Sequence, residues 1–106
     1  MQFRGGMNEL MRQAARMQRK IDQAKTELKD REVTSESLGG KAKVTVTLGR
    51  QVKRIELDAE FVKSEGLDLA LDGACAALNQ ALEQAAKAME DELEKVTGGV
   101  KIPGMV

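Results

Sequence analysis

The sequence predicts one α+β domain in which a long helix, a three-stranded antiparallel sheet and a second long helix follow one another. Two observations carry this prediction. Apolar residues recur with a helical period near the start and near the end of the chain, and with a period of two between these segments. A length of 106 residues is that of one ordinary domain, so residues 1–106 are expected to fold as one unit.

The first helix is expected over residues 7–31. Its apolar positions are separated by gaps of three and four residues, the spacing that keeps side chains on one face of a helix. Asn8 is a candidate cap for its start, and Gly5 and Gly6 predict a flexible lead-in over residues 1–6. The apolar seam of this helix consists of Met7, Leu10, Ala14, Met17, Ile21, Ala24 and Leu28, with Phe3 extending it backwards.

Three strands are expected next. Val33–Ser35 predict a short first strand that ends before the turn pair Gly39-Gly40. Apolar and polar residues then alternate over residues 42–48, and a third strand is expected over Val52–Leu57, after a turn at residues 49–51. Short connections make neighbouring strands antiparallel.

A second helical stripe closes the domain. Residues 59–66 are expected to form a connector that packs back on the core. The last helix is expected from Leu67 to Val96, and Thr97-Gly98-Gly99 is expected to end it, because glycine readily adopts the left-handed conformation found at helix ends. Residues 98–106 are expected to form a mobile tail.

The two helices are longer than the sheet. At 1.5 Å per residue they span about 36 Å and about 45 Å, whereas a seven-residue strand covers about 23 Å. The start of the first helix and the end of the last should therefore overhang the sheet and pack antiparallel as a projecting arm. A three-stranded sheet with open edges is a small body for such arms, which predicts a two-fold homodimer.

Charge is balanced in total but unevenly placed. The chain has 17 basic and 17 acidic residues. Residues 1–20 carry five basic side chains and only Glu9 as an acid, residues 41–54 carry five basic side chains and no acid, and the acids gather in residues 67–97. Such polarisation concentrates the electrostatic field on parts of the surface.

Several function classes are not expected. The chain has no His, the commonest general base near neutral pH and the commonest metal ligand. Its single Cys75 cannot build a thiolate metal site and reads as a small core residue. Neither an enzyme, a metal, a cofactor nor a small-molecule substrate is therefore expected. The absence of a long apolar run or a signal-peptide pattern predicts a soluble, cytoplasmic protein without membrane contact.

The best functional candidate is a basic stripe on the first helix, formed by Arg12, Arg16 and Arg19. At 100° per residue these arginines lie opposite the apolar seam, where they could meet successive phosphates of a nucleic acid. Two alternatives remain open: the stripe serves solubility alone, or Glu90 and Glu94 of the last helix neutralise part of it. A second basic group is more readily explained as the solvent-exposed face and edge of the sheet than as a DNA-contacting surface. It consists of Lys41, Lys43, Arg50, Lys53 and Arg54.

Short motifs along the chain resemble those of the YbaB/EbfC family of nucleoid-associated proteins. Leu10-Met11-Arg12-Gln13-Ala14 with Met17-Gln18 is similar to the signature that opens the family. The further likenesses, in the same order as in the family, are Glu32-Val33-Thr34 with Glu36-Ser37, Val44-Thr45-Val46, Lys53-Arg54-Ile55-Glu56-Leu57-Asp58, Ala76-Ala77-Leu78-Asn79-Gln80-Ala81 and Pro103-Gly104. Ser35 stands where the family often has Gly, and the tail has one Pro where relatives often have two.

The resemblance implies a tweezer-shaped dimer that binds duplex DNA in the nucleoid with little or modest sequence preference and helps to compact or bridge the chromosome. In relatives, DNA contact is attributed to the projecting helices. The residues expected to contact DNA are Arg4, Arg12, Gln13, Arg16, Arg19 and Lys20. The rival hypothesis is an adaptor whose helical arms bind a partner protein without direct DNA contact.

Overall fold

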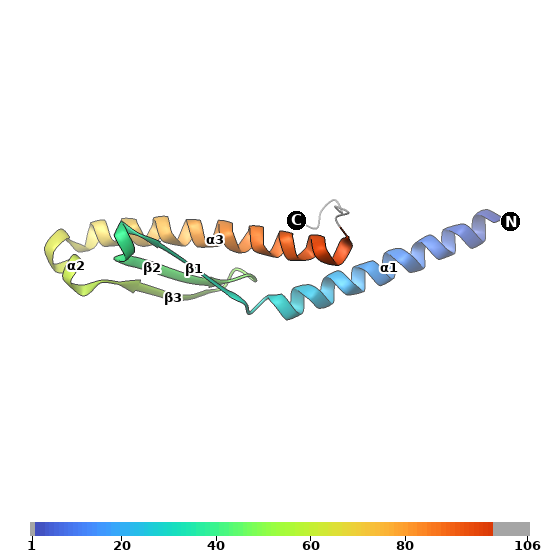
Figure 1. Cartoon of the computed structure of the whole chain (residues 1–106), viewed down its shortest axis with the longest axis horizontal. Coiled ribbons are helices and arrows are strands. Elements are labelled where there is room, and N and C mark those ends of the chain that lie inside the picture. The colour runs from blue at the N-terminus through green and yellow to red at the C-terminus, as the bar shows by residue number, and fades with distance from the viewer. Residues whose placement is uncertain (1, 99–106) are drawn as a thin grey trace.

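The predicted alternation of helical and strand segments appears in the structure, a computed structural model that describes the backbone of residues 2–98 and the side chains of residues 6–98. The described part is a rod with extents of 77 × 19 × 17 Å (Figure 1). Its elements are, in chain order, α1 (Gln2–Leu28), β1 (Glu32–Ser37), the short 3-10 helix η1 (Leu38–Gly40), β2 (Ala42–Thr47), β3 (Val52–Leu57), α2 (Ala59–Glu65) and α3 (Leu67–Thr97).

The sheet has the predicted topology. Its strands lie in the order β1-β2-β3, and both neighbouring pairs are antiparallel. β1 is longer than the expected segment, because its pairing with β2 runs from Glu32 opposite Thr47 to Ser37 opposite Ala42. Between β2 and β3 the register shifts at Thr45/Val46, which is typical of a β-bulge.

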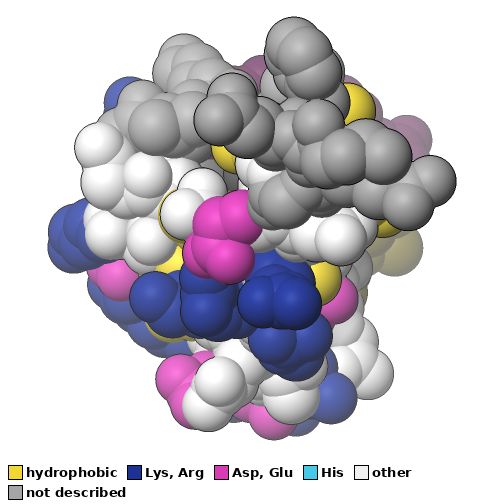
Figure 2. Space-filling model, turned by 90° about the vertical axis from the view of Figure 1, so that its right-hand side faces the viewer, with side chains coloured by type: hydrophobic (Ala, Val, Ile, Leu, Met, Phe, Trp, Pro, Cys, Tyr) yellow, Lys and Arg dark blue, Asp and Glu magenta, His cyan; other side chains and the backbone are white. Residues whose placement is uncertain are grey.

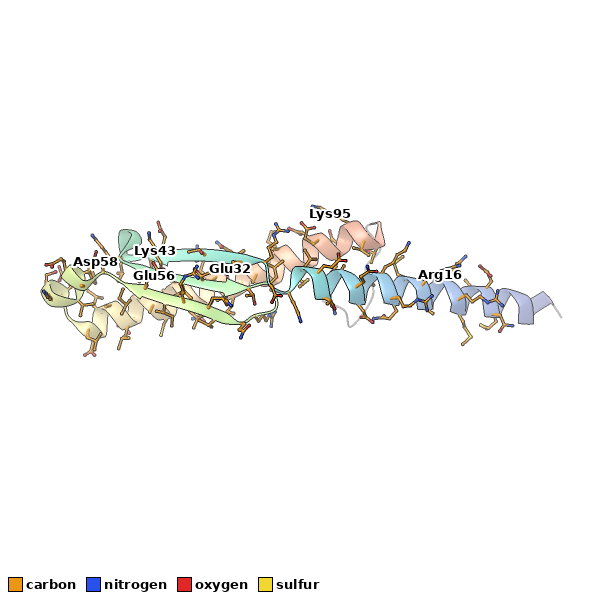
Figure 3. All side chains as sticks on the ribbon, turned by 90° about the horizontal axis from the view of Figure 1, so that it is seen from below. Arg16, Glu32, Lys43, Glu56, Asp58 and Lys95 are labelled. Carbon is orange, nitrogen blue, oxygen red and sulfur yellow. The ribbon has the colours of Figure 1, made fainter. Side chains whose placement is uncertain are left out.

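The core lies between one face of the sheet and α3. Val44 and Val46 of β2 are fully buried against Ala77, Ala81 and Ala85 of α3. These alanines carry a single methyl group each, so the helix backbone can approach the strands closely. α3 packs mainly over β1 and β2 and scarcely over β3. The opposite face of the sheet is polar, and no helix of the described residues covers it (Figure 3).

A close contact holds the N-terminal part of α3 against the end of β1. Ser37 donates a hydrogen bond from its hydroxyl to the carbonyl oxygen of Gly73, at 2.6 Å. A β-carbon on Gly73 would stand 2.8 Å from Cγ of Leu38, so only glycine leaves room for this side chain. Leu38 itself has a φ of +54°, a conformation that non-glycine residues rarely adopt.

The connector between sheet and last helix is itself helical. Asp58 caps α2 by accepting a hydrogen bond from the backbone N–H of Phe61 at 2.8 Å. Phe61 and Val62 are half-buried, as expected of a connector that packs on the core. Gly66, with a φ of +96°, separates α2 from α3.

Two expectations about the start of the chain were wrong. α1 begins at Gln2, so the segment expected as a flexible lead-in is helical from that residue, and Asn8 lies inside the helix and does not cap it. Glycine lowers helix stability by about 1 kcal/mol relative to alanine but keeps its N–H, so Gly5 and Gly6 weaken the helix without breaking it. Of the expected tail, residues 99–106 lie outside the described residues.

α1 and α3 overhang the sheet at the same end, as predicted, but the overhangs differ in length (Figure 1). α3 packs against the part of α1 nearest the sheet. Ile21 there is 1% exposed, whereas Leu10, farther out, is 63% exposed. Within residues 2–98 the arm is therefore a helix pair only at its base, and the first half of α1 projects beyond α3.

Candidate nucleic-acid interface

The basic stripe lies on the projecting half of α1. Arg12, Arg16 and Arg19 are exposed, with the side chains of Arg12 and Arg16 73% and 56% accessible. Arg12 and Arg19 are seven residues apart, so the stripe runs for about 10 Å along the helix. It points away from the seam that packs on α3 near the sheet. Figure 2 shows the end of the molecule from which α1 projects, where Lys and Arg side chains gather.

The other residues expected at this site are placed beside the stripe. Gln13 and Lys20 are exposed on α1 and flank the arginines. The backbone of Arg4 belongs to α1, but its side chain lies outside the described residues. The structure therefore brings five of the six candidate residues onto one exposed side of a single helix, where amide and guanidinium groups could donate hydrogen bonds to phosphate oxygens.

Glu9 lies within this stripe. One of its carboxylate oxygens is 3.8 Å from Nη1 of Arg12, and the other is 3.5 Å from Nη2 of Arg16. Sequence reasoning did not assign Glu9 to the site, although its spacing of three and seven residues from these arginines places all three on one side of a helix. The carboxylate therefore lies between two guanidinium groups of the stripe and offsets part of their positive charge.

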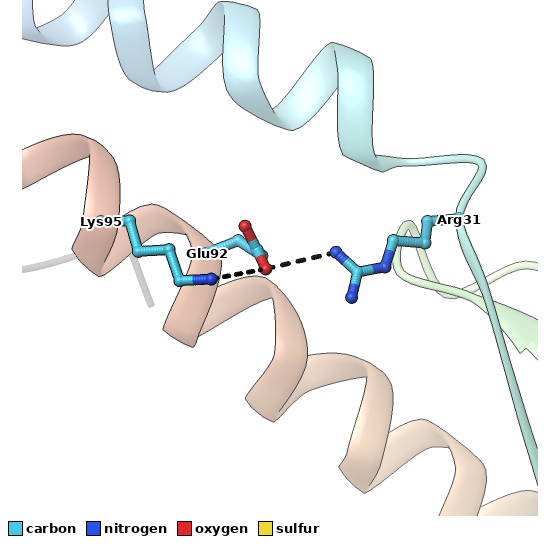
Figure 4. Close-up of polar contacts among 3 residues, drawn as sticks. All are labelled: Arg31, Glu92 and Lys95. Carbon is cyan, nitrogen blue, oxygen red and sulfur yellow. Dashed lines mark hydrogen bonds and ion pairs between the residues drawn. The ribbon is translucent and has the colours of Figure 1, made fainter.

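The acidic end of α3 also contacts the rest of the chain. Oε1 of Glu92 lies 3.2 Å from Nη1 of Arg31 and 3.2 Å from Nζ of Lys95 (Figure 4). The hydrogen bond from Lys95, and then that from Arg31, hold the pKa of Glu92 below its usual value. Arg31 follows α1, so this contact ties the base of the arm to α3.

The second basic group is partly neutralised where it lies on the sheet. Arg54 is 3.4 Å from a carboxylate oxygen of Glu32 and 3.6 Å from one of Glu56. Lys41 pairs with Asp58 at 3.8 Å. Figure 3 shows Glu32, Glu56 and Lys43 on the polar face of the sheet. Interleaved acids make this face a weaker anion-binding surface than the stripe on α1.

A metal site and a membrane-spanning helix are both absent from the described residues. Within them, no group of three or more His, Cys, Asp or Glu side chains could hold a metal ion. None of the helices in this part of the chain is long and apolar enough to span a membrane. Cys75, expected in the core, is exposed on α3. The stripe on α1 is thus the strongest candidate for a functional site.

A comparison with protein-family models matches residues 3–100 to the YbaB/EbfC DNA-binding family. The chain belongs to this family. The match includes α1 with its basic stripe, the whole sheet and α3, and so confirms the resemblance seen in the short motifs. YbaB/EbfC proteins are a family of DNA-binding proteins and not of enzymes, which agrees with the lack of catalytic side chains expected from the sequence.

Similar sequences and a solved structure with a similar fold agree with the match to the YbaB/EbfC family. A nucleoid-associated protein of Agathobacter rectalis is 36% identical over 96 residues, which cover 91% of this chain and 85% of the relative. One of Acetivibrio thermocellus is 35% identical over 104 residues, 97% of this chain and 92% of the relative. The fold is similar to that of an uncharacterized Helicobacter pylori protein, with a TM-score of 0.71 at 18% identity, covering 86% of this chain and 96% of that one.

Proposed function

We propose that the protein binds double-stranded DNA in the nucleoid, as a homodimer with little or modest sequence preference, and that it compacts or bridges the chromosome. The observation that carries this proposal is the exposed row of Arg12, Arg16 and Arg19 on a helix that projects from the body. Contacts to phosphates position a protein on DNA but read no bases, which accounts for weak sequence preference. The relatives named nucleoid-associated proteins support the same location.

The proposal predicts a steep dependence of DNA affinity on salt. Three arginines per chain give six phosphate contacts in a dimer, and each contact adds about −0.9 to the slope of log affinity against log salt, so a slope near −5 is expected. A gel-shift series on one duplex at several salt concentrations measures this slope. An absence of binding even at low salt would reject the proposal and favour the rival protein-interaction adaptor.

The homodimer is supported by an apolar surface on the body. Because α3 lies over β1 and β2, Val52 and Ile55 of β3 remain 43% and 53% exposed. Leu71 of α3 is 47% exposed. At 100° per residue it lies about 120° around α3 from Ala77, which packs on β2, and on the opposite side of Ala77 from Gly73, which contacts β1. A second copy that covers these side chains would bury the surface and protect the open edge of β3.

Placing a charge on this surface is expected to weaken the dimer. Ile55→Asp would bury a carboxylate against apolar side chains, so the dissociation constant of the dimer should rise at least about tenfold. Sedimentation equilibrium over a range of protein concentrations measures the change. Gln51→Asp, which places the same side chain in the exposed turn before β3, should leave the dimer intact. If the unaltered protein and both variants have the same average molecular mass at every dilution, this assignment of the interface is contradicted.

Neutralising Glu9 is expected to strengthen DNA binding. Glu9→Gln keeps the size of the side chain but releases Arg12 and Arg16 from a competing carboxylate, so affinity should rise about threefold to tenfold at low salt. Fluorescence anisotropy on a labelled duplex measures the change. Glu27→Gln removes the same charge from α1 beyond the end of the stripe and should have a smaller effect. If both variants gain the same affinity for DNA, the change in net charge alone explains the result.

A further inference from the structure

The apolar seam of α1 continues beyond the part that α3 covers. Ile21 is 1% exposed and Met17 is half-buried. Farther out, Ala14 is exposed, and Leu10 and Met7 are 63% and 60% exposed. The spacing of these residues places them all on one face of the helix. The same face is therefore buried at the base of the arm and open to solvent toward its tip.

The boundary between the buried and open parts of the seam lies where α3 ends (Figure 1). Leu93, in the last turns of α3, is buried, and Val96 and Thr97 are half-buried. Gly98 then turns the chain with a left-handed φ of +67°, and its N–H bonds to the carbonyl oxygen of Glu94. The chain that follows Gly98 therefore starts beside the point at which the seam of α1 becomes uncovered.

We propose that residues 99–106 of the same chain bind along the open part of the seam, from Met17 to Met7. The length is sufficient: eight extended residues reach about 26 Å at 3.3 Å each, whereas ten helical residues span about 15 Å. The segment reads Gly-Val-Lys-Ile-Pro-Gly-Met-Val and contains no acid. Val100, Ile102 and Val106 are separated by two and four residues, so in an extended chain they would share one side.

This contact goes beyond the proposed function and does not depend on it. Covering Leu10 and Met7 removes apolar side chains from water at the tip of the arm. The basic stripe lies on the opposite face of α1 and stays accessible. Bound in this way, the segment completes the arm: α3 covers the seam near the sheet, and residues 99–106 cover it farther out.

Disulfide trapping in the full-length protein tests this contact. In a Cys75→Ser background, Leu10→Cys combined with Ile102→Cys should form a disulfide within one chain under mild oxidation. The matched control is Arg12→Cys with Ile102→Cys, because Arg12 lies two residues away on the opposite face of α1. Mixing isotope-labelled with unlabelled chains before oxidation, followed by mass spectrometry of the linked peptides, distinguishes bonds within a chain from bonds between chains.

Three outcomes of the trapping would overturn the proposal. The Leu10 and Arg12 pairs could react equally, the linked peptides could come only from two different chains, or the Leu10 pair could fail to react. A second measurement uses protein with 13C-labelled methionine methyl groups. Ile102→Asp should shift the Met7 methyl resonance toward that of an exposed methionine, whereas Lys101→Asp should not. An unchanged Met7 resonance in the Ile102 variant would also overturn it.

Discussion

Replacing Arg12, Arg16 and Arg19 together by alanine is expected to lower the affinity for duplex DNA by a factor on the order of 100 or more at low salt. The three guanidinium groups are exposed on the projecting half of α1, so the change removes six candidate phosphate contacts from the proposed homodimer. The slope of log affinity against log salt should become shallower by about 5. Gel shifts at several salt concentrations measure both quantities on the same samples.

A matched control separates the site from net charge. Lys43, Arg50 and Lys53 are three exposed cations on the body, and their replacement by alanine changes the charge of the chain by the same amount. This variant should bind DNA much more tightly than the α1 variant. Far-ultraviolet circular dichroism establishes that both variants are folded. Equal losses of affinity in the two variants would place DNA contact over the general surface and not on the arm.

Gly73→Ala is expected to lower the free energy of unfolding by about 1–3 kcal/mol, the usual cost of forcing a methyl group into a filled space. The added β-carbon would stand 2.8 Å from Cγ of Leu38 and 3.1 Å from Oγ of Ser37. Leu38 itself lies in η1, between β1 and β2, with a backbone φ of +54°. Urea unfolding at one fixed protein concentration measures the change.

A double variant identifies the cause of this loss. In a Leu38→Gly background the clashing side chain is absent and the positive φ is unstrained, so adding Gly73→Ala should cost little. Gly6→Ala provides a control at an exposed helical glycine, where a β-carbon meets nothing within 4 Å; alanine there should not destabilise the protein. The same cost of Gly73→Ala in both backgrounds would show that contact with Leu38 is not responsible.

Most of the fold could be predicted from the sequence, because the period of apolar residues changes where the secondary structure changes. Val52–Leu57 is a strand with the predicted bounds, and α3 ends within one residue of the expected position. The start of α1 could not be predicted in the same way. Gly5 and Gly6 favour a break locally, but the helix continues through them to Gln2.

The candidate site was predictable in part. The positions of Arg12, Arg16 and Arg19 on one face follow directly from helical geometry. The extent to which each helix overhangs the sheet does not follow from helical geometry, because it depends on how α3 packs on the strands. For the same reason the sequence could not indicate that Ile55 would be exposed while Val44, its partner across the strands, is fully buried.

The ion pair between Arg31 and Glu92 lies at the base of α1, the point about which this long helix would tilt. With 27 residues, α1 extends about 40 Å from its base. A tilt of about 10° at that base displaces the tip by about 7 Å, which is more than the 5.4 Å pitch of an α-helix. In the proposed homodimer, the distance between the two tips would therefore depend on the chain at residues 29–31, far from the arginines that α1 carries.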